Sequence, residues 1–473
     1  MVGSSPASVK LLITSKIDDK INLMYKPYQK PVEIASSDVK VPPPKISNLV
    51  IFVVSILSTV YLRILFGFAK ISVQNDDILF DVFRRALSKQ SRCIIAFRHP
   101  DGREPQFLTW FFLYRLRALA AKKKVRFAIR PHSIFVYGYE VARWGGWVAR
   151  FFMPNLGAIP IHHTKLDSKG MARIHSTIVD GPYPVSLAPE GQVSYTTDSV
   201  PRLESGIVRI GFQAAGQLKE KDQNCPLEIL PISFHLRYDK WGEAAMKKLL
   251  KKIESLCGFN IKETSRFPFA ERLSKCREYI LSLNEKRYAI KTGDALSFEK
   301  RLDQVNNAAL EAAERTLGIQ GEGDFFARLY KVRHDCWDKI FVPGYDNFKN
   351  VPPVNRSVMD LGAGEAWYAS RHQELCDFGW YFKQPLPSDN AALHLKVEYV
   401  QNLFDFASRS MGGAISNRVN IQPSKVILIS APPINLSGRL NQYKEDRKTV
   451  ITETMAALEK SYLDCIEKVN KTN

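Results

Sequence analysis

The sequence lacks any pair of cysteines at the spacing of a zinc site or a redox motif. Its seven cysteines, at positions 93, 225, 257, 276, 336, 376 and 465, lie far apart and form no CxxC. This usage predicts reduced thiols in a cytosolic compartment, not a disulfide scaffold. A P-loop and a Gly-x-Ser-x-Gly elbow are also missing, so ATP hydrolysis and serine-hydrolase chemistry are not indicated. We therefore expect no metal and no bound cofactor.

Acidic residues are scarce relative to basic ones. The 473 residues include 67 Lys and Arg against 48 Asp and Glu, which gives a formal net charge of +19. Such a surplus favours an anionic partner. No helix-turn-helix, zinc-finger or RNP-like motif is present, and the basic residues are spread along the chain, so nucleic acid is not the expected partner. Hydrophobic residues make up 45% of the chain and charged residues 24%, which is ordinary for a globular protein. The length suggests two or three domains.

Long apolar runs are rare, and the main one covers residues 46–69, interrupted by Arg63. A bilayer span needs about 20 apolar residues, so a span here requires Arg63 to snorkel to the interface. The polar N-terminal segment, residues 1–45, lacks the arrangement of a cleavable signal peptide. We expect residues 46–70 to form a membrane-associated helix, either spanning or lodged in one leaflet. A buried core helix is the alternative.

After this segment, short apolar runs alternate with helical stretches. The pattern predicts strands at residues 93–97, 125–129, 183–187, 227–234 and 425–430, and helices at 107–121 and 446–469. Strands separated by helices indicate an α/β fold with a mixed sheet flanked by helices. We expect a core domain over residues 71–240, a mainly helical insertion over 241–423, and a late strand and C-terminal helix of the core over 424–473.

The first candidate site follows the strand at residues 93–97. His99 stands five residues before Glu104, where the strand gives way to a helix. A carboxylate in the first helical turn could fold back onto the imidazole, fix its tautomer and raise its basicity, which would make His99 a general base. Asp101 and Glu104 also have the spacing of a capping box, so helix capping is the alternative role for Glu104.

Two further motifs lie near strand ends. Glu190 and Gly191 follow the strand at 183–187, where ligands of α/β folds gather, although turn formation explains the Pro-Glu-Gly sequence equally well. Residues 157–163 read Gly-Ala-Ile-Pro-Ile-His-His. Adjacent histidines on a strand point in different directions, so His162 and His163 are not expected to share a metal.

In this order, the motifs resemble those of the PlsC-like glycerolipid acyltransferase family, which includes lysophosphatidic acid and glycerol-3-phosphate acyltransferases. The family's His-x4-Asp motif corresponds to His99–Glu104. Its Gly-x-Ile-Pro-x-x-Arg and Pro-Glu-Gly-Thr-Arg-Ser motifs correspond to residues 157–163 and 189–194, and its Val-Pro-Ile-like strand to 230–232. Residues 425–433 look like the family's late strand. The chain departs from the pattern at Glu104 (usually Asp), at His163 (usually Arg), and at Gln192 and Val193 (usually Thr and Arg).

The resemblance implies a membrane-attached O-acyltransferase of phospholipid biosynthesis whose active site faces the cytoplasm. An acyl-CoA or acyl carrier protein thioester would be the donor, and a lysophospholipid or glycerol phosphate the acceptor. His99 and Glu104 would be catalytic. The implied substrate-binding residues are Arg103, Arg130, Gly157, His163, Glu190 and Gly191.

Three alternatives remain open on the sequence. The acceptor could carry a neutral hydroxyl, because arginine is missing from two motifs. The protein could be a membrane-bound scaffold without activity. Residues 358–367 also look like a methyltransferase glycine motif that lacks its third glycine, for which a plain turn between helices is the simpler explanation.

Overall fold

The computed structural model describes residues 32–37, 40–64, 70–162, 167–221, 225–291, 296–345, 347–378, 382, 384–413 and 418–472. The chain divides into two compact units. We call residues 39–238 with 422–473 the core unit, and residues 1–38 with 239–421 the helical unit. Each is described by itself.

The core unit is built on an eight-stranded mixed sheet in the order β2-β9-β7-β3-β6-β4-β5, with β10 beside β7. β7 runs antiparallel to β9 and parallel to β3, and β6, β4 and β5 continue the parallel part. The predicted α/β class with a mixed sheet is confirmed. The strands are β2 (Lys70–Gln74), β3 (Arg92–Phe97), β4 (Ile134–Gly138), β5 (Ile159–Ile161), β6 (Val185–Leu187), β7 (Leu227–Arg237), β9 (Lys425–Ser430) and β10 (Ile434–Asn435).

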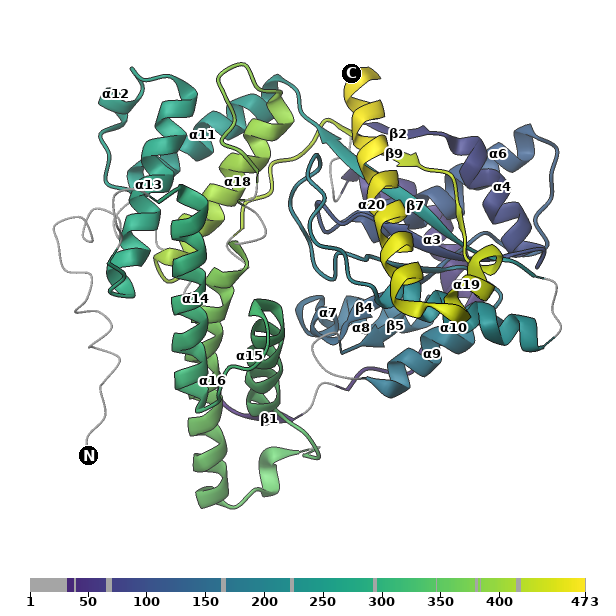
Figure 1. Ribbon diagram of the computed structural model, residues 1–473, viewed down its shortest axis with the longest axis horizontal. Coiled ribbons are helices and arrows are strands. Elements are labelled where there is room, and N and C mark those ends of the chain that lie inside the picture. The colour runs from purple at the N-terminus through teal and green to yellow at the C-terminus, as the bar shows by residue number, and fades with distance from the viewer. Residues whose placement is uncertain are drawn as a thin grey trace. The chain divides into compact units, whose positions relative to one another are not determined.

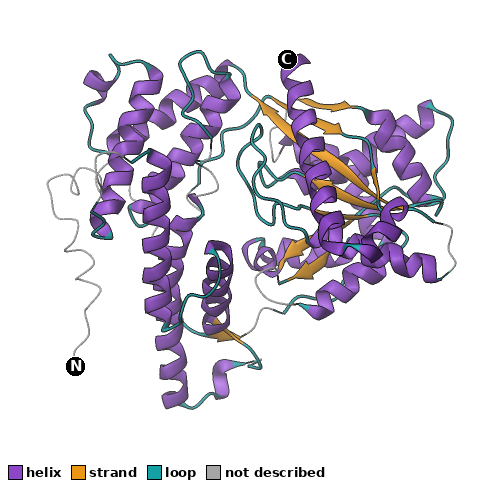
Figure 2. Ribbon diagram, in the orientation of Figure 1, coloured by secondary structure: helices purple, strands orange, loops and turns teal. Residues whose placement is uncertain are grey.

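Helices cover both faces of this sheet (Figures 1 and 2). One face carries α4 (Asp76–Leu87) and a continuous helical run of α5 (Glu104–Trp110), the π-helix η2 (Phe111–Arg115) and α6 (Leu116–Lys122), where Phe107 packs against Phe234 of β7. The other face carries α9 (Ser168–Asp180), α10 (Gly206–Glu220) and α20 (Arg447–Thr472), where Cys465 packs with Ile427 of β9. The remaining helical elements are α3 (Asn48–Ile64), α7 (Tyr139–Trp144), α8 (Gly146–Asn155), η5 (Ser437–Arg439) and α19 (Leu440–Glu445).

Four of the five predicted strands are confirmed as β3, β6, β7 and β9. The strand predicted at residues 125–129 is wrong, because these residues form no strand and the next one is β4. Val125, Phe127 and Ile129 are partly buried against the core, and Phe127 lies 5.8 Å from the Phe80 ring of α4. Their alternation therefore reflects loop residues that pack inward, not a strand that pairs.

The helix α3 has two unlike faces. Ile51, Ser55 and Ser58 are buried at helical spacing. The opposite side exposes five large apolar side chains: Leu49, Phe52, Val53, Ile56 and Leu57. The predicted membrane helix over 46–70 is not supported, since α3 has 17 residues and a span needs about 20. Within the part of the chain that the structure describes, no helix combines the length with the apolarity that crossing a bilayer requires.

The helical unit consists mainly of long amphipathic helices, with β1 (Ser36–Ser37) paired in parallel to β8 (Phe341–Val342). The helices of this unit are α11 (Lys240–Leu256), α12 (Ile261–Thr264), α13 (Phe269–Arg287), α14 (Phe298–Leu317), α15 (Phe325–Ile340), η3 (Phe348–Asn350), α16 (Pro353–Cys376) and α18 (Leu393–Ser410).

Residues 358–367 lie inside the continuous helix α16, so neither a glycine-rich nucleotide turn nor a plain turn exists there.

Candidate functional site

Two loops meet at one edge of the core sheet. β3 and β6 are parallel neighbours, so the segments that follow them leave the sheet at the same edge, where α/β folds bind ligands. We call residues 98–104 the His99 turn and residues 188–199 the Glu190 loop. The turn leads into α5, and the loop leads toward α10.

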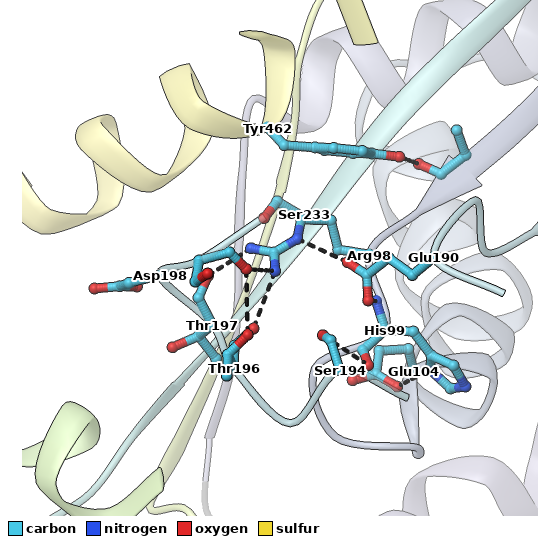
Figure 3. A network of polar contacts seen from close by, with 12 residues as sticks. Arg98, His99, Glu104, Glu190, Ser194, Thr196, Thr197, Asp198, Ser233 and Tyr462 are labelled. Carbon is cyan, nitrogen blue, oxygen red and sulfur yellow. Dashed lines mark hydrogen bonds and ion pairs between the residues drawn. The ribbon is translucent and has the colours of Figure 1, made fainter. Parts of the chain in front are cut away.

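His99 and Glu104 form a close pair within the His99 turn. His99 Nδ1 lies 2.6 Å from Glu104 Oε2, and Figure 3 shows the imidazole beside the carboxylate. The Glu104 side chain is fully buried, whereas that of His99 is 19% exposed. An ionised carboxylate only accepts hydrogen bonds, so this contact favours the neutral tautomer in which Nδ1 carries the proton and Nε2 the lone pair. This is the tautomer that a general base requires.

Glu104 also organises the backbone of its own turn. Its oxygens accept the N–H groups of Asp101, at 2.6 Å, and Gly102, at 2.8 Å. The helix α5 begins at Glu104 itself, and its N-cap residue Arg103 makes no side-chain capping bond. Of the capping box predicted as the alternative, the half made by Glu104 is formed, because its carboxylate accepts the Asp101 N–H, while the Asp101 carboxylate pairs with Arg103. Glu104 thus supports both the turn and the imidazole with the same carboxylate.

The surroundings of His99 raise the pKa of its imidazole. Burial by itself lowers the pKa of His99, but the Glu104 carboxylate, followed by the negative charges of Glu190 and Asp101, outweighs burial and moves the pKa above its ordinary value of 6.5. A base with a raised pKa binds the proton of an acceptor hydroxyl more strongly, so His99 is suited to proton abstraction near neutral pH.

Glu190 lies buried behind the His99 backbone, bonded to an arginine that the sequence reasoning missed. Its Oε1 accepts from Arg98 Nε at 3.0 Å, and its Oε2 accepts from the His99 N–H at 3.2 Å. Arg98 and Glu190 both have fully buried side chains. The local sequence signal was a charged residue shortly after each of two apolar strands, but only the structure shows that β3 and β6 are neighbours.

The two predicted glycines shape turns. Gly191 has a φ of +72°, which favours glycine, and its N–H donates to the Ala188 carbonyl at 3.2 Å. Gly157 has a φ of +77°, and a Cβ there would lie 2.8 Å from Ile134 and 3.0 Å from Ile46. Gly191 thus belongs to the loop beside His99, while Gly157 allows close packing of α8, β4 and the chain before α3.

The predicted basic residues are separated. Arg103 joins the His99 turn, where it forms an ion pair with Asp101 that includes an Nη2–Oδ2 contact of 2.7 Å. Arg130 instead contacts α3: it donates to Ser55 Oγ at 2.6 Å and lies 4.9 Å from the centre of the Phe52 ring. His163 lies outside the described residues. The structure therefore brings together His99, Glu104, Arg103, Glu190 and Gly191, and places the contacts of Arg130 on α3.

A second group of residues in the core unit has the Ser–His–Asp contacts of a serine-hydrolase triad. Ser233 Oγ lies 3.0 Å from His235 Nε2, and His235 Nδ1 lies 3.7 Å from Asp198 Oδ1. Ser233 and His235 are fully buried within β7, and burial lowers the pKa of His235 to about 4. A nucleophile enclosed in the middle of a strand cannot reach a substrate, so we assign this cluster to the interior of the fold.

The His99 site thus offers a histidine–carboxylate pair at a sheet edge, backed by a buried ion pair. Among the residues that the structure describes, no three His, Cys, Asp or Glu side chains gather as a metal site. The chemistry that these groups can perform is proton transfer to and from a bound hydroxyl or leaving group.

Comparisons with known proteins add no relative to this description: no family model, curated protein or solved structure matches the chain.

Proposed function

We propose that the protein is an O-acyltransferase that moves a fatty acyl group from an acyl thioester to a hydroxyl acceptor. The observation that carries this proposal is the His99 Nδ1–Glu104 Oε2 contact of 2.6 Å, in a partly exposed turn at the carboxyl edge of the sheet. The order of the sequence motifs supports acyl transfer over other reactions that use a histidine base.

In this mechanism, Nε2 of His99 takes the proton of the acceptor hydroxyl while its oxygen attacks the thioester carbonyl carbon. Glu104 stabilises the imidazolium that forms, because its carboxylate accepts a hydrogen bond from the His99 Nδ1–H. The tetrahedral intermediate then collapses, the C–S bond breaks, and the thiolate leaves and takes the proton back from Nε2. Positioned general-base catalysis of this kind contributes about 10²–10⁴-fold.

The acceptor is a lysophospholipid or glycerol phosphate in the first form of this proposal. One observation favours an acceptor with a neutral hydroxyl as the second candidate. Both arginines of the His99 turn already face a carboxylate, since Arg98 pairs with Glu190 and Arg103 with Asp101. A phosphate would have to compete with those carboxylates for the guanidinium groups.

We also propose that the enzyme works at a membrane surface, through the exposed apolar sides of α3 and α8. On α3, Leu49 and Ile56 are 71% and 58% exposed, and on α8, Trp147 and Phe151 are 72% and 51% exposed. The residues just before α3 meet the end of α8, where the Lys45 N–H donates to the Pro154 carbonyl at 2.7 Å. Neither helix contains an acidic residue, which suits an anionic bilayer.

The direct test is an acyl-transfer assay on purified protein. Labelled acyl-CoA and acyl carrier protein thioesters are each supplied with lysophosphatidic acid, glycerol 3-phosphate and a neutral monoacylglycerol. We expect transfer to at least one acceptor together with release of the thiol. Failure of every donor and acceptor pair, with no thioester cleavage, would leave the non-catalytic scaffold as the better description.

A further inference from the structure

The backbone of His99 is bonded on both sides by the Glu190 loop. Its N–H donates to Glu190 Oε2 at 3.2 Å, and its carbonyl accepts the Ser194 N–H at 2.9 Å. The direction of a side chain follows the position of its backbone. A displacement of the Glu190 loop would therefore also displace the His99 imidazole relative to Glu104.

Arg98 holds the Glu190 loop in turn. Its guanidinium bonds the Glu190 carboxylate and three loop carbonyls, those of Thr196 at 3.0 Å, Thr197 at 2.5 Å and Ser199 at 2.6 Å. The loop thus wraps around one buried charge. Successive residues of an extended chain point to opposite sides, and Figure 3 shows Arg98 directed toward Thr196 and Asp198, away from the His99 ring.

The helix α20 encloses this ion pair from the far face of the sheet. The fully buried Tyr462 hydroxyl donates to the Ala96 carbonyl at 3.0 Å, and Asn470 donates to Asp198 at 2.8 Å. A buried charge without its partner is strongly unfavourable. Arg98 and Glu190 therefore stay together, and the Glu190 loop has little freedom to move.

We propose that Arg98 and Glu190 are positioning residues for His99. Their buried ion pair fixes the Glu190 loop against the His99 backbone and so directs the imidazole toward Glu104. This inference rests on the proposed role of His99 as a general base. It gives Glu190 a role other than substrate binding, since both carboxylate oxygens are already bonded.

The test is Glu190→Gln, which keeps the shape of the side chain and removes its charge. We measure kcat, KM for donor and acceptor, and the His99 titration by NMR. We expect kcat to fall about 100-fold, as for a small misplacement of a reacting group, with both KM values within about twofold of wild type. The pKa of His99 should also fall, because Glu190, with Glu104 and Asp101, raises it. The variant retains the positive charges of Arg98 and Arg103 in this region, and positive charges favour the neutral imidazole.

Two results would overturn the proposal. A higher KM with unchanged kcat and His99 titration would make Glu190 a substrate ligand. A lower melting temperature with kcat per folded molecule and titration both unchanged would make the pair structural only. The matched control is Glu254→Gln in the helical unit, where a buried glutamate bonds Arg272 at 2.7 and 2.9 Å. Its kcat and His99 titration should match wild type.

If Glu190→Gln does not fold, the double variant Arg98→Gln/Glu190→Gln replaces it, because removing both charges leaves neither unpaired. The same fall in kcat supports the proposal, and its absence overturns it; the His99 pKa is not the criterion for this variant, because the losses of the two opposite charges offset each other. NMR also separates the two proposals. If wild type transfers no acyl group, the proposed function fails, while loss of the NMR signal of the His99 Nδ1–H bonded to Glu104 in the variant still demonstrates the positioning.

Discussion

Two histidines, one in each unit, show how a partner decides what an imidazole can do. In the core unit, the Glu104 carboxylate overcomes burial and raises the pKa of His99. In the helical unit, His372 Nδ1 lies 2.9 Å from the Tyr288 hydroxyl, and burial lowers the pKa of His372 to about 4. A neutral hydroxyl does not offset desolvation as a carboxylate does. Of these two, only His99 is suited to take up a proton near neutral pH.

The two histidines also make folding stability depend on pH in opposite directions. His99 has a raised pKa, so its contribution to stability is present below the unfolded value of about 6.5 and is lost as pH rises through the folded pKa. His372 has a lowered pKa, so its contribution is present above about 6.5 and is lost as pH falls toward 4. This difference gives each unit its own pH response.

The largest expected effect separates the two histidines by activity. His99→Ala should lower kcat by at least about 100-fold, because it removes the general base, with a modest loss of melting temperature, because the buried Glu104 carboxylate keeps the N–H groups of Asp101 and Gly102. His372→Ala is the control and should keep kcat within about twofold of wild type. Steady-state acyl-transfer rates and thermal unfolding of both variants decide the matter. Activity of His99→Ala within about threefold of wild type would remove His99 from the general-base role.

The next largest effect is expected when Glu104, the carboxylate partner of His99, is replaced. Glu104→Gln should lower kcat by about 10–100-fold, and Glu104→Asp should restore part of it. A base must be unprotonated to act, so activity should rise with pH through the His99 pKa, above 6.5 in wild type. In Glu104→Gln this acid limb should move to lower pH. A Gln variant with normal turnover and an unmoved limb would reduce Glu104 to a support for the turn.

The sequence predicted the His99–Glu104 pair because both residues lie within one strand-to-helix connection. Local spacing was enough for that contact. It could not identify the Arg98–Glu190 pair, whose residues are 92 positions apart and meet only because β6 lies beside β3 in the sheet. The same limit explains the wrong strand at 125–129. Alternating burial is a local pattern, whereas pairing depends on which strands the rest of the chain places alongside.

Both units also expose apolar side chains on a helix, and a third prediction tests whether only those of the core unit bind a membrane. Ile56→Glu on α3 and Trp147→Glu on α8 should each lower binding to phosphatidylglycerol-containing vesicles about tenfold or more, because burying such a side chain contributes about 1.5–3 kcal/mol. Val358→Glu on α16, 66% exposed in wild type, is the control and should bind as wild type does. Vesicle flotation measures the bound fraction. Equal losses in all three variants would contradict a specific membrane face on the core unit.

The smallest expected effect concerns Arg130, for which the sequence and the structure suggest different roles. The family resemblance implied a phosphate ligand, whose loss would raise the acceptor KM strongly. In the structure, its guanidinium bonds Ser55 and lies over Phe52, both on α3. We therefore expect Arg130→Ala to leave the acceptor KM within about twofold of wild type and to lower the free energy of unfolding by about 1 kcal/mol, the scale of one hydrogen bond with a cation–π contact.

Ser55→Ala is the matched variant, since it removes the other partner of that bond and should give a similar but smaller loss of stability. Acceptor kinetics and chemical denaturation of the two variants provide the measurement. A rise of the acceptor KM of tenfold or more in Arg130→Ala alone, seen with phosphorylated acceptors and not with neutral ones, would return Arg130 to phosphate binding. The acceptor would then be a phosphorylated one, and α3 would belong to the boundary of its binding site.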